Sequence, residues 1–311
     1  MNEMERVAAT ASPLMLAERE VPVVHMADRS GGRLRAFWTW CATHRSGVVG
    51  LVVIAALVLF SFVGPRIYHT DQVLTNLTSV NLAPSSAHLL GTDDVGYDLL
   101  GRLMQGGQSS LEVGFAAAAL ASTIGTLWGA ISGYVGGWVD SVMMRVVDSA
   151  FSIPPLLLLL LIGTIFTPSL IELIIVLGLV SWLVTARLVR GDSLSLRTRE
   201  YVQAAKMVGA RGPRVVARHV IPNALGTIAV QTTFAVATAI LLLASLSFLG
   251  LGPAPPAANW GAMLSNGLNY IYAGYWWQIY PAGLVIVITV LAFNMFAEAV
   301  RDTFETRLAN A

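Results

Sequence analysis

Long apolar runs alternate with short polar segments along most of the chain, and this pattern predicts several membrane crossings. About 20 mainly apolar residues are needed to cross roughly 30 Å of hydrocarbon. Six runs reach that length, and we expect transmembrane helices at 47–66, 111–133, 149–167, 170–189, 226–249 and 280–299. Only three residues separate the third run from the fourth, which favours a tight helical hairpin. The predicted fold class is an all-α polytopic membrane protein with six transmembrane helices.

The segments before and between the runs suggest a simple domain organisation. Residues 1–30 mix charges and prolines without a helical period, as in a cytosolic tail. Residues 31–46 interleave cations with aromatic rings, which predicts an interfacial elbow helix. The six-helix domain then occupies 47–311. Within it we expect outside loops at 67–110 and 250–278 and a cytosolic loop at 190–225.

The distribution of positive charge predicts the orientation. Of the 19 Lys and Arg residues, 6 precede the first run, 1 follows the second, 8 lie between Arg187 at the end of the fourth run and Arg218, and 2 follow the sixth, which makes 17 on one side. Positive charge is retained on the cytoplasmic side of membrane proteins. Both termini and the 190–225 loop are therefore predicted to be cytosolic.

Residue spacing in and around the runs predicts three further features. Gly125, Gly129 and Gly133 recur every fourth residue, so a neighbouring helix should approach that face closely. A capped helix should start near Asp93 or Asp94 before the second run. The uncharged, aromatic 250–278 segment should dip back to the membrane interface.

Composition excludes several classes of function. Charged residues make up 12% of the chain, about half the usual share, and form no basic face for nucleic acid. One cysteine cannot form an intrachain disulfide, and the five histidines lack the spacing of a zinc site. The only lysine, Lys206, precedes Met207, so no Walker A phosphate loop is present. We therefore expect a protein that is not an enzyme and has no cofactor of its own; ATP and Mg²⁺, if used, would bind to partner subunits.

The predicted spans contain almost no ionisable residue at mid-depth. Ion-coupled carriers usually retain such residues for their ion pathway. Here the charged groups fall near predicted span ends: Glu112, Asp148, Glu172, Arg187 and Glu298. The interior polar groups are uncharged, and the candidates for a translocation path are Ser181, Gln231, Thr232, Ser245 and Asn294. Hydrogen bonding between helices is the alternative role for each of them.

Residues 199–223 form a basic, polar island between two apolar runs. Its composition predicts a helix over 201–208, a break at 209–213, a second helical run over 214–220 and a stop at Pro222. One interpretation is a solvated loop. The other is a docking element for a separate protein that supplies the energy.

The island resembles the cytosolic signature of permease subunits of ATP-binding-cassette importers, in particular the C-type permease of the oligopeptide, dipeptide and nickel branch. That signature is Glu-Ala-Ala, three residues, Gly, and then an aliphatic-x-Leu-Pro ending. Gln203, Ala204, Ala205, Gly209 and Pro222 fall at the spacings of that signature, and Ile221 takes the place of its Leu. Gln203 departs from the family by replacing the acidic residue, and His219 by standing where an aliphatic residue is common.

Three more segments resemble the same branch, in the same order. They are Leu90–Asp98 with Arg102, Leu246–Gly252 with Pro255, Pro256 and Trp260, and Thr289–Asn294 with Arg301 and Asp302. The resemblance implies a type I importer permease in the bacterial inner membrane that forms half of a path for dipeptides or oligopeptides. It also implies a sister permease, one or two ATPase subunits that contact the island, and an extracytoplasmic substrate-binding protein. A nickel or other small-solute importer, or an ion-coupled carrier, remains the alternative.

Overall fold

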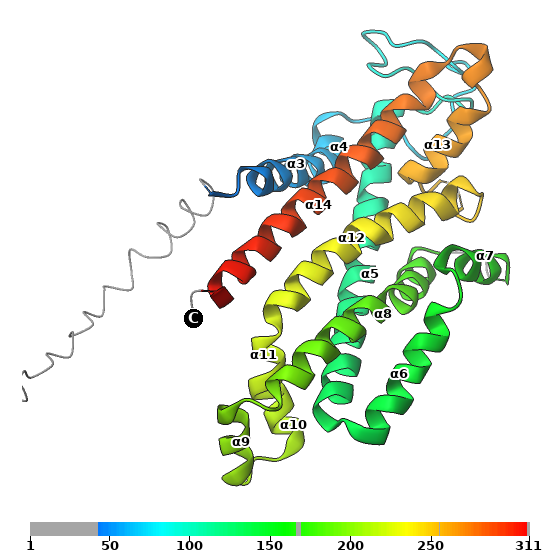
Figure 1. The fold of residues 1–311 in the computed structure, drawn as a ribbon. Coiled ribbons are helices and arrows are strands. Elements are labelled where there is room, and N and C mark those ends of the chain that lie inside the picture. The colour runs from blue at the N-terminus through cyan, green and yellow to red at the C-terminus, as the bar shows by residue number, and fades with distance from the viewer. Residues whose placement is uncertain (1–42, 166–168, 255, 310–311) are drawn as a thin grey trace, which may run out of the picture. The chain divides into compact units, whose positions relative to one another are not determined.

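The computed structural model describes residues 43–165, 169–254 and 256–309, with side chains through residue 304 (Figure 1). The predicted tail at 1–30, most of the elbow at 31–46, and the turn at 166–168 lie outside these residues. Within these described residues, five helical segments are long and apolar enough to span a membrane. They are α3 (Arg45–Phe62), α5 (Leu99–Val135), α8 (Leu170–Leu196), α12 (Leu225–Phe248) and α14 (Tyr280–Ala309) with the turn before it.

The third predicted span is wrong in its position and shape. Instead of one helix over 149–167, the structure has α6 (Gly137–Phe151) and α7 (Pro155–Ile165), which together pass as one span bent by 77°. The bend follows from Pro154 and Pro155, because a proline lacks an N–H and disfavours helical geometry in the residue before it. The charged residues of α6 lower its local hydropathy, so the apolar pattern did not predict that its first half belongs to a span.

The longest helix, α5, has 37 residues and extends about 55 Å. It begins later than the predicted Asp93 or Asp94, because Asp98 supplies the cap: its side chain accepts from the Gly101 N–H at 2.9 Å. The predicted glycine face is confirmed against α8. A Cβ at Gly125 would lie 2.6 Å from Thr185 Cβ, and one at Gly133 would lie 2.6 Å from the Arg190 carbonyl oxygen. The helix backbones thus touch where these glycines recur.

One end of the bundle, called the outer end because we predict it to lie outside the membrane, is closed by short elements: α4 (Gly64–Ile67), α13 (Trp260–Leu268), and the 3₁₀ turns η3 (Ile271–Ala273) and η4 (Trp276–Gln278). Trp260 is 1% exposed and its indole N–H donates to the Leu103 carbonyl at 2.9 Å. Trp277 is also buried. These two aromatic rings of the 250–278 segment therefore pack inside the protein, and the return of the segment to the membrane interface stays a prediction.

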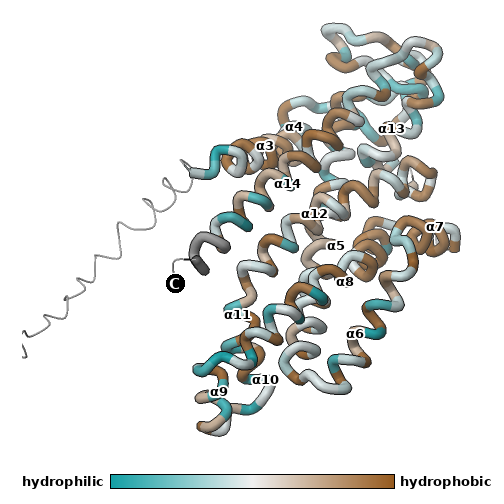
Figure 2. Tube along the Cα trace, viewed as in Figure 1, coloured by the Kyte–Doolittle hydropathy of each residue, from teal (hydrophilic) through white to brown (hydrophobic). Residues whose placement is uncertain are grey.

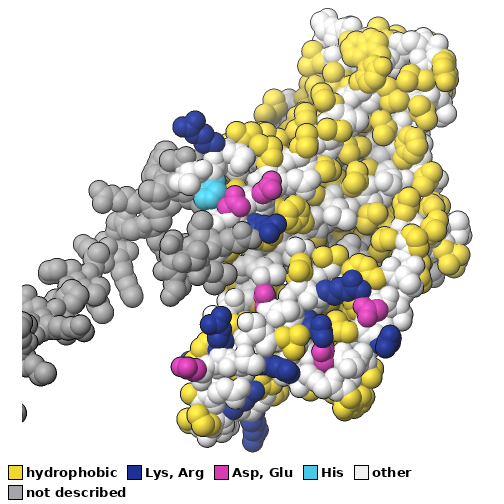
Figure 3. All heavy atoms as spheres, in the orientation of Figure 1, with side chains coloured by type: hydrophobic (Ala, Val, Ile, Leu, Met, Phe, Trp, Pro, Cys, Tyr) yellow, Lys and Arg dark blue, Asp and Glu magenta, His cyan; other side chains and the backbone are white. Residues whose placement is uncertain are grey.

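The opposite end, called the inner end because we predict it to be cytosolic, carries α9 (Glu200–Met207), α10 (Gly212–Val215), the π-helical turn η2 (Val216–Val220) and α11 (Ile221–Asn223). Apolar residues dominate the spans, whereas hydrophilic residues gather at α9 and α10 and in the outer loops (Figure 2). On the face shown in Figure 3, many of the charged side chains lie over α6, α8 and the α9–α10 region. The 199–223 island thus lies at one end of an apolar bundle.

Candidate functional site

The island is a helix–turn–helix, and the turn depends on one glycine. Gly209 has a φ of +88°, a conformation that side chains disfavour, and a Cβ there would contact nothing within 4 Å. Its N–H donates to the Lys206 carbonyl at 2.9 Å, and the Ala210 N–H donates to the Ala205 carbonyl at 3.0 Å. These bonds close the end of α9 and reverse the chain.

Buried side chains and polar contacts fix this element to the ends of α5 and α8. Val202 and Val215 are fully buried. Gln203 Nε2 donates to the Arg197 carbonyl at 2.8 Å, and the Arg197 guanidinium reaches the Gly133 carbonyl at 3.4 Å. The Lys206 ammonium lies 4.9 Å from the centre of the Tyr134 ring. The helix pair is therefore braced against two spans.

The residues predicted to contact an ATPase divide into exposed and packed positions. Exposed are Gln203, Ala204, Gly209 and Pro222, whereas Ala205 and His219 are partly buried. The His219 ring lies 6.1 Å from the Tyr201 ring. Gln203, the departure from the family signature, makes an internal hydrogen bond that a carboxylate could not donate.

Pro222 does not end the helical run, which corrects the predicted stop. Helical turns continue through α11 into α12. Because Pro222 has no N–H to donate, the turn before it widens: the Ile221 N–H donates to the Val216 carbonyl, five residues back. The helical run therefore continues from the island into α12 through a widened turn.

A row of charges between α6 and α8 escaped the sequence analysis. Asp140 binds Arg190 through two hydrogen bonds of 2.5 and 2.6 Å and also accepts one from Ser132. Farther along, Arg187 donates to Asp148 at 2.7 Å. We predicted that Asp148 and Arg187 lie near span ends, but they lie inside α6 and α8. The error arose because α6 starts 12 residues before the predicted third span and α8 continues to Leu196.

The predicted translocation-path residues lie in different surroundings. Ser181 and Gln231 line a cavity of about 380 Å³ between the α6–α7 corner, α8 and α12, and Ser181 Oγ is buried without a partner. Thr232 pairs with Ser122 at 2.6 Å. Ser245 donates to the Leu241 carbonyl within its own helix at 2.8 Å, and Asn294 is partly buried on α14. The cavity brings together only the first two of the five.

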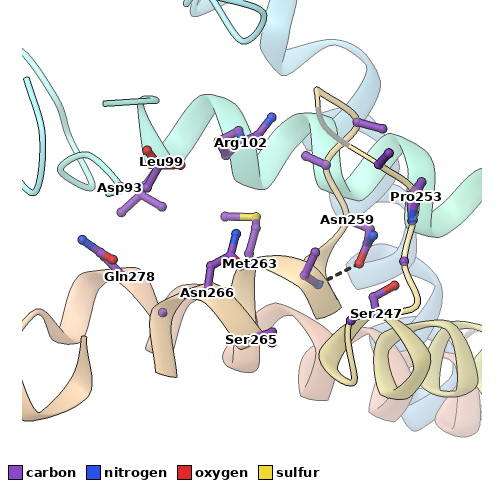
Figure 4. Close-up of a pocket in the computed structure, with 17 residues that line it drawn as sticks. Asp93, Leu99, Arg102, Ser247, Pro253, Asn259, Met263, Ser265, Asn266 and Gln278 are labelled. Carbon is purple, nitrogen blue, oxygen red and sulfur yellow. Dashed lines mark hydrogen bonds between the residues drawn. The ribbon is translucent and has the colours of Figure 1, made fainter. Parts of the chain in front are cut away.

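A second cavity, of about 390 Å³, lies at the outer end between the start of α5, the 250–259 segment and α13 (Figure 4). Its polar side chains are those of Asp93, Arg102, Ser247, Asn259, Ser265, Asn266 and Gln278. Burial raises the pKa of the Asp93 carboxyl, against hydrogen bonds from the Tyr97 and Val95 N–H groups that lower it. Among the described residues, no group of three or more His, Cys, Asp or Glu side chains could hold a metal ion.

Comparison with known proteins identifies the family to which this chain belongs. Residues 125–310 match the family model described as binding-protein-dependent transport system inner membrane component. The chain belongs to this family. Residues 33–84 match a second model, the N-terminal transmembrane domain of oligopeptide transport permease C. The fold is thus the type I importer permease fold, and the protein is a multi-pass inner-membrane permease, as the resemblance implied.

Curated relatives of the permease match over most of its length. The oligopeptide transport system permease protein OppC of Bacillus subtilis is 38% identical over 86% of this chain and 87% of its own. The dipeptide transport system permease protein DppC of the same organism is 36% identical over 87% of this chain and 85% of its own. The DppC protein of Alkalihalophilus pseudofirmus is 35% identical over 96% and 98%. The similarity therefore extends well beyond the island.

Proposed function

We propose that this chain forms half of the translocation path of an ATP-driven importer of dipeptides or oligopeptides. Relatives named as oligopeptide and dipeptide permeases match 84% or more of the chain, which supports peptides as the cargo class. The other half of the path would come from a sister permease. An extracytoplasmic binding protein would deliver the peptide.

The observation that carries the mechanism is the braced α9–α10 element at the end of α8. One or two ATPase subunits, which hold ATP and Mg²⁺, dock on its exposed surface at Gln203, Ala204 and Gly209. A small side chain such as Ala204 suits insertion of the helix into a cleft of the partner. The placement of positive charge supports a cytosolic position for this end and for both termini.

Gly209→Trp tests the docking surface. Gly209 is exposed and has open space at its Cβ position, so the indole projects outward without disturbing the spans. Gly274→Trp is the matched control: Gly274 has a φ of +81°, is exposed and also has open space, but it lies in the outer loops. Both changes impose the same backbone strain, about 1–2 kcal/mol.

Each variant is reconstituted with its partner subunits in proteoliposomes, and dipeptide uptake and ATP hydrolysis stimulated by the binding protein are measured. We expect Gly209→Trp to abolish both, while Gly274→Trp retains normal ATPase coupling. Normal uptake and stimulated hydrolysis in the Gly209 variant would refute docking at this turn. Uptake of peptide by this chain alone, driven by an ion gradient, would refute ATP coupling altogether.

A further inference from the structure

The outer cavity contains a buried arginine whose charge is not neutralised by contact. Arg102 lies on the first turn of α5 and is 9% exposed. One guanidinium nitrogen donates to the Pro256 carbonyl at 2.8 Å, and the group stacks 4.2 Å from the Tyr97 ring. Within the described part of the chain, no carboxylate oxygen lies within 4.0 Å of its nitrogens. Asp93 and Asp94 lie near enough to attract the guanidinium but do not touch it, so its remaining N–H groups can still contact an anionic group.

Two more polar side chains on the cavity wall each have a buried atom without a hydrogen-bond partner among the described residues. Asn259 is 1% exposed; its Oδ1 caps α13 by accepting from the Ala262 N–H, and its Nδ2 has no partner (Figure 4). The Ser247 hydroxyl is likewise buried and unpaired. A Cβ on Gly252 would lie 2.7 Å from Ser247 Oγ and 3.2 Å from Asn259 Nδ2, so both groups surround one point. Such atoms need a hydrogen-bonding occupant.

The donors from α5 and α13 lie close along the α5 axis. Gly106 follows Arg102 by four residues, on the same face of the helix. A Cβ on Gly106 would lie 3.2 Å from Asn259 Cα, so Asn259 packs about one turn from Arg102. An anion in the cavity can therefore be flanked by a guanidinium and a side-chain amide.

The cavity also presents one negative group. Asp93 uses Oδ1 to accept from the N–H groups of Val95 and Tyr97 at 3.1 and 2.8 Å. In the described part of the chain, its Oδ2 accepts no hydrogen bond. One arginine and one aspartate on the same wall match a ligand that carries both charges (Figure 4).

We propose that the outer cavity binds a small zwitterionic peptide, with Arg102 and Asn259 holding its carboxylate and Asp93 facing its ammonium group. This inference rests on the proposed peptide transport. It goes further by assigning a peptide-binding site to the permease itself, in the segment just outside the spans. The cavity volume of about 390 Å³ limits the occupant to a short peptide or to one end of a longer one.

Equilibrium binding of radiolabelled alanyl-alanine to the full chain in lipid nanodiscs tests the site. Asn259→Asp is the main variant: it keeps the oxygen that caps α13 but replaces the free N–H₂ group with a negative oxygen. Asn269→Asp adds the same charge at the exposed far end of α13 and is the matched control. Arg102→Gln removes the guanidinium, and circular dichroism checks that each variant is folded.

We expect saturable binding to the wild type and to Asn269→Asp, and affinities roughly 10- to 100-fold weaker for Asn259→Asp and Arg102→Gln. Alanyl-alanine amide, which lacks the carboxylate, should compete 10- to 100-fold less well than the free dipeptide. Equal competition by the amide, or full binding by folded Asn259→Asp, would overturn the site. Import of the dipeptide by the reconstituted complex without any binding to this chain would overturn the site and leave the proposed function standing.

Discussion

The Asp140–Arg190 pair joins α6 to α8 next to the α9–α10 element, and its removal should be costly. Arg190→Gln leaves the Asp140 carboxylate with Ser132 as its remaining hydrogen-bond donor. The Asp140 side chain is 11% exposed and that of Arg190 is 34% exposed. The variant therefore leaves a carboxylate that is mostly buried without its arginine partner.

The magnitude follows from that burial. Breaking a fully buried pair costs about 3–5 kcal/mol, whereas an exposed pair contributes about 0–1 kcal/mol. Because Arg190 is partly exposed, we expect Arg190→Gln to lower the free energy of unfolding by about 2–3 kcal/mol. Asp140→Asn in the same background should recover part of the loss, with a coupling energy of about 1–3 kcal/mol.

Unfolding in mixed micelles, followed by far-UV circular dichroism as the denaturing detergent increases, measures these differences. Arg214→Gln, on the exposed face of α10, is the control and should change stability by less than about 0.5 kcal/mol. If Arg190→Gln costs no more than Arg214→Gln, or if the double variant shows simple additivity, the pair does not stabilise the α6–α8 contact.

Three other predictions concern single positions. Gly129→Leu should destabilise by about 1–3 kcal/mol or more, because its Cβ meets the backbone of α8, while Gly191→Leu, with open space, stays near wild type in the same unfolding assay. Burial raises the pKa of Asp93, so the folded state binds a proton at this carboxyl more tightly than the unfolded state does. The free energy of unfolding should therefore rise as pH falls through the raised pKa toward about 3.9. Asp93→Asn should flatten this rise when unfolding is measured across pH. Asp98→Ala should cost about 2–3 kcal/mol by removing a helix cap and the acceptor for Tyr68 and His88, whereas Asp98→Asn retains the cap and should cost less in a denaturant titration.

Hydropathy identified the spans that are apolar along their whole length. It failed at α6, where Asp140, Arg145 and Asp148 interrupt the apolar pattern although the helix belongs to a bent span. A charge inside a span lowers local hydropathy in the same way as a loop does. Only the position of α8 shows that Asp140 and Asp148 have partners.

The island was predictable because its signals are local. The sequence predicts a helix over 201–208 and a break at Gly209, and the structure has α9 followed by a turn at Gly209. The outer cavity was not predictable, since Arg102, Ser247 and Asn259 are far apart in the chain and meet only when α13 folds back on α5. The predicted helix stop at Pro222 was wrong for another reason. A π turn before the proline accommodates its missing N–H, so the helical run does not end there.

The bracing of the island limits how a force on it can be transmitted. Gln203 bonds the backbone of Arg197 at the end of α8, the Arg197 side chain bonds the end of α5, and Arg190 holds α6. A flexible loop would change shape when a partner moved it. Here the contacts of Gln203, Arg197 and Arg190 connect α9 to α8, α5 and α6. In the proposed mechanism, movement of α9 by an ATPase therefore shifts the inner ends of α5, α6 and α8 together as a rigid group. Arg190→Gln, which leaves the docking surface unchanged, should then separate ATP hydrolysis from transport in the reconstituted complex, with hydrolysis retained and uptake lost.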